Sequence, residues 1–233
     1  MKKVGFLFFL AALVIGLVVA NTFSFGRAST DFVKFSVNFG SARGSGNIVT
    51  EKREVSGFKS VDVGGVFQVE IVAQKEFGVE VEADDNLIGL IQTRVDGDTL
   101  RIESDKRLKS SSPIKIRISA PKIDGLQVSG AANVTANGLK SESLKIESSG
   151  GSRVTVAGEA VKLTVESSGG ARVNAGGLST VDANIEGSGG SSVEVSVTGD
   201  LRSDISGGAR VTYSGTPANI VTNKSGGARV SQK

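Results

Sequence analysis

Apolar and polar residues alternate through most of the chain from residue 47 onward. The clearest alternation lies at 58–63, 66–72, 79–83, 99–103 and 114–118, and turn residues bound most of these runs. Side chains of a β-strand point alternately to its two faces, so a period of two predicts strands with one buried face. Residues 85–91 fit either a helical turn or a short edge strand, and Asp96-Gly97-Asp98 has the composition of a hairpin turn.

From residue 122 to the end of the sequence the alternation becomes a repeat. A string related to Ser-Gly-Gly-Ala-Arg-Val occurs six times, beginning at Ser129, Ser149, Ser168, Ser188, Ser206 and Ser225. The steps between these serines are 20, 19, 20, 18 and 19 residues. A nearly constant period of this size is typical of a repeat architecture, in which each unit stacks on the next.

The repeats can be aligned on the first glycine of each turn. The fourth residue after that glycine is always valine, and apolar residues stand six positions before it in the later repeats: Leu144, Leu163, Ala183, Leu201 and Ile220. This pattern predicts two short strands per repeat on either side of a fixed turn. A coil of 18–20 residues cannot bury its inner face alone, whereas parallel stacking buries it against the neighbouring coils. We therefore predict an all-β fold, a parallel β-helix or β-solenoid.

Glycine at the turn has a conformational reason. A sharp corner between strands needs backbone angles that glycine adopts without a Cβ penalty. We therefore expect Gly170→Val to destabilise the protein through backbone strain.

The first 26 residues have the features of a targeting segment. Lys2 and Lys3 precede an uncharged run over 4–26, and Val18-Val19-Ala20 resembles a signal-peptidase site. The run is also long enough for an uncleaved membrane anchor, and both interpretations place the remaining chain outside the cytoplasm. The predicted organisation then continues with a linker at 27–46 and a single domain at 47–233. Within that domain, 47–121 forms less regular coils and 122–233 forms the regular repeats.

Composition removes several classes of function. The chain has no cysteine and no histidine, which excludes disulfides, thiol chemistry and the commonest metal ligand and general base. No glycine-rich turn is followed by the Lys-Ser/Thr of a phosphate-binding loop. The net charge is only +3 and no basic stripe with interleaved aromatics is present beyond the N-terminus. We expect no cofactor, no metal and no nucleic-acid partner.

Two columns of charged residues emerge from the alignment. Three positions before the turn glycine stand Gln127, Glu147, Glu166, Glu186, Asp204 and Asn223, and three positions after it stand Asn133, Arg153, Arg172, Ser192, Arg210 and Arg229. Parallel stacking would repeat each column at the strand spacing of about 4.8 Å, where like charges repel. An acidic column beside a basic one across the corner would relieve that repulsion. The columns either stabilise the register or form a surface for a charged glycan or cell-envelope polymer.

An enzyme that acts on polysaccharides is the alternative from a different functional class. A glycoside hydrolase needs two carboxylates with distinct roles across a cleft. The acids of this sequence recur once per coil, and no long loop separates a distinct pair, so we expect a protein that is not an enzyme. A third alternative is a self-assembling structural protein that associates through the ends of the solenoid, because the last coil leaves a sheet edge open.

Several segments together resemble the head GIN domain family. The resemblance starts at Gly46-Asn47-Ile48, passes through 54–65 and the run 79–87 with its Asp84-Asp85-Asn86-Leu87, and includes 95–102 and the repeated Ser-Gly turns. It covers about 47–230. The resemblance implies a right-handed β-helix outside the cytoplasm, in the periplasm or at the cell surface, with an adhesin-like role and no established catalytic residues. Membrane contact through the N-terminal segment follows if that segment is not cleaved.

Overall fold

The computed structural model describes residues 40–233. The predicted signal or anchor segment at 1–26 and the first part of the predicted linker, up to residue 39, lie outside the described residues. No helix in the described part is long and apolar enough to cross a membrane. The strands are β1 (Ser41–Arg43), β2 (Ile48–Arg53), β3 (Ser60–Gly65), β4 (Gln68–Ala73), β5 (Gly78–Asp84), β6 (Ile91–Asp96), β7 (Thr99–Ser104), β8 (Arg107–Lys109), β9 (Lys115–Ala120), β10 (Gly125–Gly130), β11 (Asn133–Ser148), β12 (Arg153–Ser167), β13 (Arg172–Gly187), β14 (Ser192–Val197), β15 (Asp200–Ile205), β16 (Arg210–Ser214), β17 (Asn219–Lys224) and β18 (Arg229–Gln232), and a 3-10 turn, η1 (Ile88–Leu90), precedes β6.

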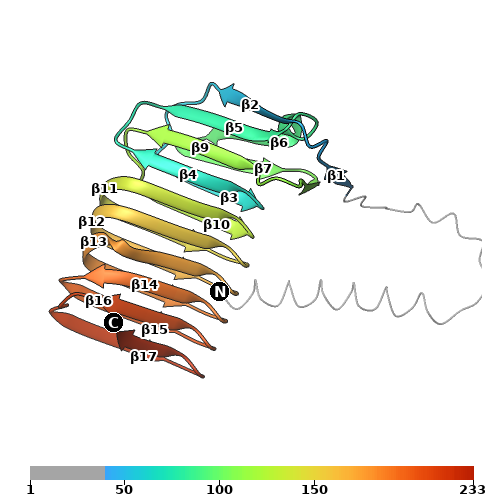
Figure 1. Ribbon diagram of the computed structural model, residues 1–233. Coiled ribbons are helices and arrows are strands. Elements are labelled where there is room, and N and C mark those ends of the chain that lie inside the picture. The colour runs from blue at the N-terminus through green and yellow to red at the C-terminus, as the bar shows by residue number, and fades with distance from the viewer. Residues whose placement is uncertain (1–39) are drawn as a thin grey trace, which may run out of the picture. The chain divides into compact units, whose positions relative to one another are not determined.

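The strands stack into two walls, which Figure 1 shows from the side. The first wall has the order β18-β16-β14-β13-β12-β11-β4-β9-β5-β2. The second wall has the order β17-β15-β13-β12-β11-β10-β3-β7-β6. The long strands β11, β12 and β13 bend and contribute to both walls. The prediction of a parallel β-solenoid is confirmed.

The register of the coils is the one that the alignment predicts. Val134 pairs with Val154, Val154 with Val173 and Val173 with Val193, and all of these side chains are buried. On the second wall Leu144, Leu163, Ala183 and Leu201 form an equally buried column. Apolar side chains from neighbouring coils therefore lie on one another along the whole stack, and this burial holds the thin interior together.

The coil at the C-terminal end of the described chain is less covered. Ile220 and Val221 of β17 are 46% and 48% exposed, although Ile220 continues the column of Leu201. Exposed apolar side chains on an edge strand are a template for pairing with other chains. Self-association through the solenoid ends stays a prediction.

The corners contain glycine in the left-handed conformation, as the sequence suggests. Only the first glycine of each Ser-Gly-Gly turn adopts it. Gly169 has φ +70°, and a Cβ there would lie 2.9 Å from the carbonyl oxygen of Gly150. That oxygen accepts a 2.8 Å hydrogen bond from the amide of Gly170. Gly170 itself lies outside the left-handed region, and its Cβ would make an ordinary 3.6 Å contact. The backbone strain that the sequence predicted for a substitution of Gly170 is therefore expected for a substitution of Gly169.

The N-terminal end departs from the coil pattern. Strand β5 runs antiparallel between β2 and β9, and β6 forms an antiparallel hairpin with β7. Residues 47–121 therefore combine parallel strands with an antiparallel cap instead of forming only irregular coils. Strand β1 pairs in parallel with β8, so the folded unit begins before residue 47 and includes part of the segment that the composition assigned to a linker.

A buried carboxylate fastens the chain entering this cap. Asp84, which has no exposed surface, accepts a 2.7 Å hydrogen bond from the amide of Gly46 and another from the hydroxyl of Ser110. Its neighbour Asp85 accepts bonds of 2.5 Å from Ser45 Oγ and 3.0 Å from Asn47 Nδ2. The Asp84-Asp85 clamp thus joins three segments that are distant in the sequence.

We expect the clamp to loosen in acid. The hydrogen bond from Ser110 and that from the Gly46 amide lower the pKa of Asp84, and the bonds from Ser45 and Asn47 lower the pKa of Asp85. A depressed pKa in the folded state stabilises the fold above the ordinary value of about 3.9, and this stabilisation is lost as the pH falls through the lowered value. Protection of the Gly46 amide from hydrogen exchange, relative to its intrinsic exchange rate at each pH, should therefore fall below that pH in the natural chain.

Asp84→Asn removes the titrating group and should flatten the pH dependence of this exchange. Glu142→Gln, which changes an exposed carboxylate of the solenoid, serves as the control and should leave the profile unchanged. Identical profiles for the natural chain and Asp84→Asn would contradict the role of the clamp.

Candidate functional site

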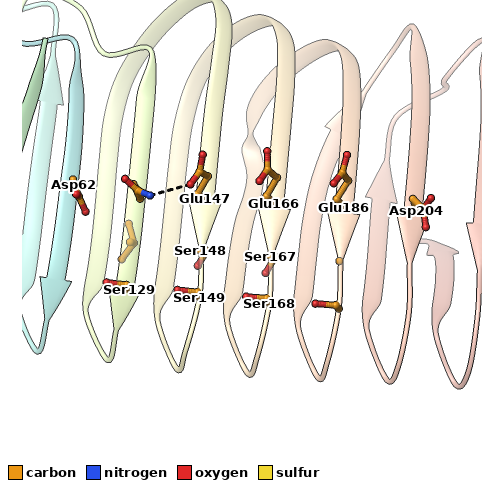
Figure 2. A pocket seen from close by; sticks show the side chains of 14 residues that line it. Asp62, Ser129, Glu147, Ser148, Ser149, Glu166, Ser167, Ser168, Glu186 and Asp204 are labelled. Carbon is orange, nitrogen blue, oxygen red and sulfur yellow. Dashed lines mark hydrogen bonds between the residues drawn. The ribbon is translucent and has the colours of Figure 1, made fainter. Parts of the chain in front are cut away.

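An open groove runs across the outer face of the second wall, with a volume of about 730 Å³. We call it the acidic groove and define it by the carboxylates of Asp62, Glu147, Glu166, Glu186 and Asp204 together with the amide of Gln127. Figure 2 shows these side chains in a row, one from each coil, with serines of the corner beside them.

The row follows from strand register. Asp62 pairs with Gln127, Gln127 with Glu147, Glu147 with Glu166, Glu166 with Glu186 and Glu186 with Asp204. Each of these residues precedes a turn glycine by the same distance, so parallel stacking places them at one height on the wall. Ser129, Ser149, Ser168 and Ser188 begin the turns and line one edge of the groove.

A single ammonium group partly compensates the carboxylates. Lys145 Nζ lies 2.6 Å from Glu147 Oε1 and 3.0 Å from Glu166 Oε1, and these contacts raise the pKa of Lys145. Gln127 Nε2 donates a 3.0 Å hydrogen bond to Glu147 Oε2. Within the described residues no ion pair reaches Glu186 or Asp204, so the far half of the groove keeps its negative charge.

Asp62 stands at the N-terminal end of the groove in a different environment. It is less exposed than the other acids, and burial raises the pKa of its carboxyl group, although Arg101 at 3.7 Å opposes this shift. A raised pKa in the folded state means that the ionised form is disfavoured there.

The arginines form a second column, on the first wall. Arg153 pairs with Arg172, Arg172 with Ser192, Ser192 with Arg210 and Arg210 with Arg229. All four arginine residues are exposed. Arg153 Nη1 donates a 3.0 Å hydrogen bond to Asn133 Oδ1, whereas no salt bridge in the described part of the chain joins any of the four to a carboxylate.

The sequence suggested that the two columns compensate each other's charge across the corner. In the structure they do not. The reason lies inside the corner. Ser148 and Ser152 both point inward, and their hydroxyl oxygens lie 2.8 Å apart. Glu147 and Arg153, the next residues outward on each side, consequently point to the outer faces of different walls.

No metal centre is evident in the described chain. No group of three or more acidic, histidine or cysteine side chains among residues 40–233 is arranged to hold a metal ion. The carboxylates of the groove occupy equivalent register positions in successive coils, although Asp62 is less exposed than the others. The geometry suits contact with an extended charged ligand better than chemistry on one bond.

A family model described as "Putative auto-transporter adhesin, head GIN domain" matches residues 57–217. The chain belongs to this family. Two crystal structures share the fold of this head GIN domain. A "putative adhesin" from Bacteroides fragilis superposes with a TM-score of 0.70 at 22% identity, covering 82% of this chain and 100% of that protein. Another from Parabacteroides merdae gives 0.50 at 16% identity, covering 83% and 99%. No curated protein matches the chain.

Two of the segments that carry the resemblance meet in the clamp of this head GIN domain. Gly46-Asn47 and Asp84-Asp85-Asn86 form the clamp, in which Asn86 Oδ1 also accepts a bond from the Ser45 amide. Gly44 lies so close that a Cβ would overlap the carboxylate of Asp84. These segments therefore hold the N-terminal cap together.

Some residues of the groove were not found from the sequence of this head GIN domain. Asp62 lies before the regular repeats, but it stands three positions before Gly65, and this spacing could have placed it in the row. Lys145 stands two positions before Glu147 on the same strand, and the period of two could have placed both on one outer face. The serines that begin the turns were recognised as corner residues, but not as part of a groove.

Proposed function

We propose that this chain is an exported, non-catalytic adhesin-like protein that binds an anionic polymer of the cell envelope through its arginine column. The observation that carries the proposal is that Arg153, Arg172, Arg210 and Arg229 stand in one in-register, exposed column and form no ion pair within the described residues. Export is supported by the uncharged segment 4–26 and by membership of a family that is named for adhesins.

The column suits a polymer because its charges repeat along a rigid support. Adjacent coils are separated by about 4.8 Å, and a guanidinium group can bind a carboxylate, sulfate or phosphate with two hydrogen bonds. Each exposed contact is weak, but several contacts to one chain act together and raise the overall affinity. Beside the arginines, Thr155, Asn174 and Thr212 present hydroxyl and amide groups to the same face, and Glu194 in the same column is paired with Lys233.

A polysaccharide-active enzyme is the competing proposal, with the acidic groove as its site. Glycoside hydrolysis requires one carboxyl group as acid and a second as nucleophile or base. Glu147 and Glu166 instead share the ammonium group of Lys145 as equivalent members of a row. We therefore favour binding over turnover.

The test is a binding measurement on the protein as purified from cells. Immobilised polyphosphate, a polyuronate and a neutral glucan serve as probes, at about 50 mM and about 500 mM salt. We expect binding to the two anionic polymers only, weakened at least tenfold by Arg172→Gln combined with Arg210→Gln. Arg202→Gln, an exposed arginine on the second wall, is the matched control and should bind as the natural chain does.

Release of shorter products from any probe would overturn the non-catalytic assignment. Equal binding by the double variant and the natural chain would overturn the role of the arginine column. Recovery of the protein from the cytoplasmic fraction alone would contradict export.

A further inference from the structure

The acidic groove and the arginine column flank the same corner in every regular coil. Glu147 and Arg153 stand one residue outside Ser148 and Ser152, whose hydroxyl oxygens touch inside the corner. They consequently lie at the same distance from the corner, on the outer faces of the two walls. The successive coils repeat this arrangement with Gln127 and Asn133, Glu147 and Arg153, Glu166 and Arg172, Glu186 and Ser192, Asp204 and Arg210, and Asn223 and Arg229.

The arginine column and the far half of the acidic groove offer charges that the fold itself does not pair. No salt bridge in the described chain connects a carboxylate of the groove with an arginine of the column, and Glu186 and Asp204 have no ion pair there, whereas Glu147 and Glu166 share Lys145. The corner edge of one wall is therefore acidic and that of the other is basic. Opposite charges coincide at three of these coils if the two kinds of face meet, namely at Glu147 and Arg153, Glu166 and Arg172, and Asp204 and Arg210.

We propose that the protein associates with a second copy of itself, the first wall of one copy docking on the second wall of the other. The two copies are parallel and related by a shift perpendicular to the walls. This shift places the arginine column of one copy over the acidic groove of the other. Arg153 then faces Glu147, Arg172 faces Glu166 and Arg210 faces Asp204, while Ser192 lies opposite Glu186.

The neighbouring columns of the two walls are compatible with this docking. Next to the acids the second wall presents Lys145, Thr164, Asn184 and Arg202. Next to the arginines the first wall presents Thr155, Asn174, Glu194 and Thr212. In the parallel arrangement Lys145 meets Thr155 and Arg202 meets Thr212. No like charges are opposed in either column, so the same shift satisfies both.

The contact is heterologous, because it joins two different faces. After docking, each copy still has one free face of each kind, so the association can continue into an open row of parallel molecules. Individual exposed ion pairs are weak and screened by salt, and only their number makes the contact stable. The association should therefore depend steeply on ionic strength.

Charge reversal on each face separately provides the test. Arg172→Glu with Arg210→Glu places carboxylates opposite Glu166 and Asp204, and Glu166→Lys with Asp204→Lys places ammonium groups opposite Arg172 and Arg210. Sedimentation velocity of the protein as purified from cells, at about 50 mM salt, should show association of the natural chain and at least tenfold weaker association of each variant alone. An equimolar mixture of the two variants should associate again, because the introduced carboxylates of one variant then meet the introduced ammonium groups of the other.

The control carries the net-charge change of the arginine variant at positions elsewhere on the surface. Lys106→Glu with Lys140→Glu alters two exposed lysines outside both columns and should sediment as the natural chain does. A natural chain that remains monomeric at low salt and high concentration would overturn the proposal. A mixture of the two reversed variants that stays dissociated would overturn it as well.

This proposal does not depend on the binding of an anionic polymer. The variant with Glu166→Lys and Asp204→Lys retains all four arginines, so it should lose self-association and keep polymer binding. Failure of polymer binding by the natural chain would leave the sedimentation result unaffected. Added polyphosphate should dissociate the natural assemblies if both proposals hold, since it competes for the arginine column.

Discussion

Replacing Gly169 with alanine should lower the free energy of unfolding by about 2–3 kcal/mol. Holding an alanine in the left-handed conformation costs about 1–2 kcal/mol, and the added Cβ would meet the Gly150 carbonyl oxygen at 2.9 Å. Since this oxygen also accepts the Gly170 amide, relieving the overlap weakens a backbone hydrogen bond worth about 1 kcal/mol. Urea denaturation followed by far-UV circular dichroism would measure the loss.

Gly170→Ala is the matched control, one residue away in the same turn. Its φ lies outside the left-handed region and its Cβ would make an ordinary contact. Alanine also restricts the unfolded chain, so we expect a change within about 0.5 kcal/mol in either direction. Equal destabilisation by the two substitutions would refute the assignment of the strained position to Gly169.

Leu163→Ala should destabilise the protein by about 2–4 kcal/mol. Leu163 is completely buried and stands in the stack of Leu144, Ala183 and Leu201. Removing a buried leucine side chain costs its transfer free energy and leaves a cavity, which the rigid coils on either side cannot easily close. Equilibrium unfolding in urea again provides the measurement.

Val161→Ala supplies the comparison for Leu163→Ala. Val161 lies two residues earlier on the same strand but is 53% exposed. Its truncation should change the free energy of unfolding by less than about 0.5 kcal/mol. A comparable loss at both positions would contradict the difference in burial between Leu163 and Val161.

The register of the regular coils was predictable because every repeat shows the same spacing of apolar residues around the turn glycine. A shift by one residue would move Val154, Val173 and Val193 from the core to solvent, so period and alternation together determine the register. The outward columns followed from the same alignment. The surroundings of these columns could not be predicted, because Glu147 and Arg153 are close in sequence but lie on the outer faces of different walls.

The N-terminal cap shows where sequence patterns fail. Alternation at 79–83 predicts a strand, and β5 is one, yet the pattern contains nothing about its neighbours or direction. The Asp84-Asp85 clamp depends on residues about 40 positions away, such as Ser45 and Asn47. In a single sequence those acids look like ordinary turn residues, because only the folded backbone brings Gly46 and Ser110 to them.

The corner glycines also bear on how such a protein can change its length during evolution. Each carbonyl oxygen, as at Gly150 and Gly169, occupies the space of a Cβ in the next coil and binds that coil's amide. Any duplicated coil that begins with the same turn therefore brings a corner that fits both neighbours. Insertion or loss of whole coils would leave the rest intact, and each added coil would extend both outer columns by one position. The number of repeats therefore sets the length of the charged surface.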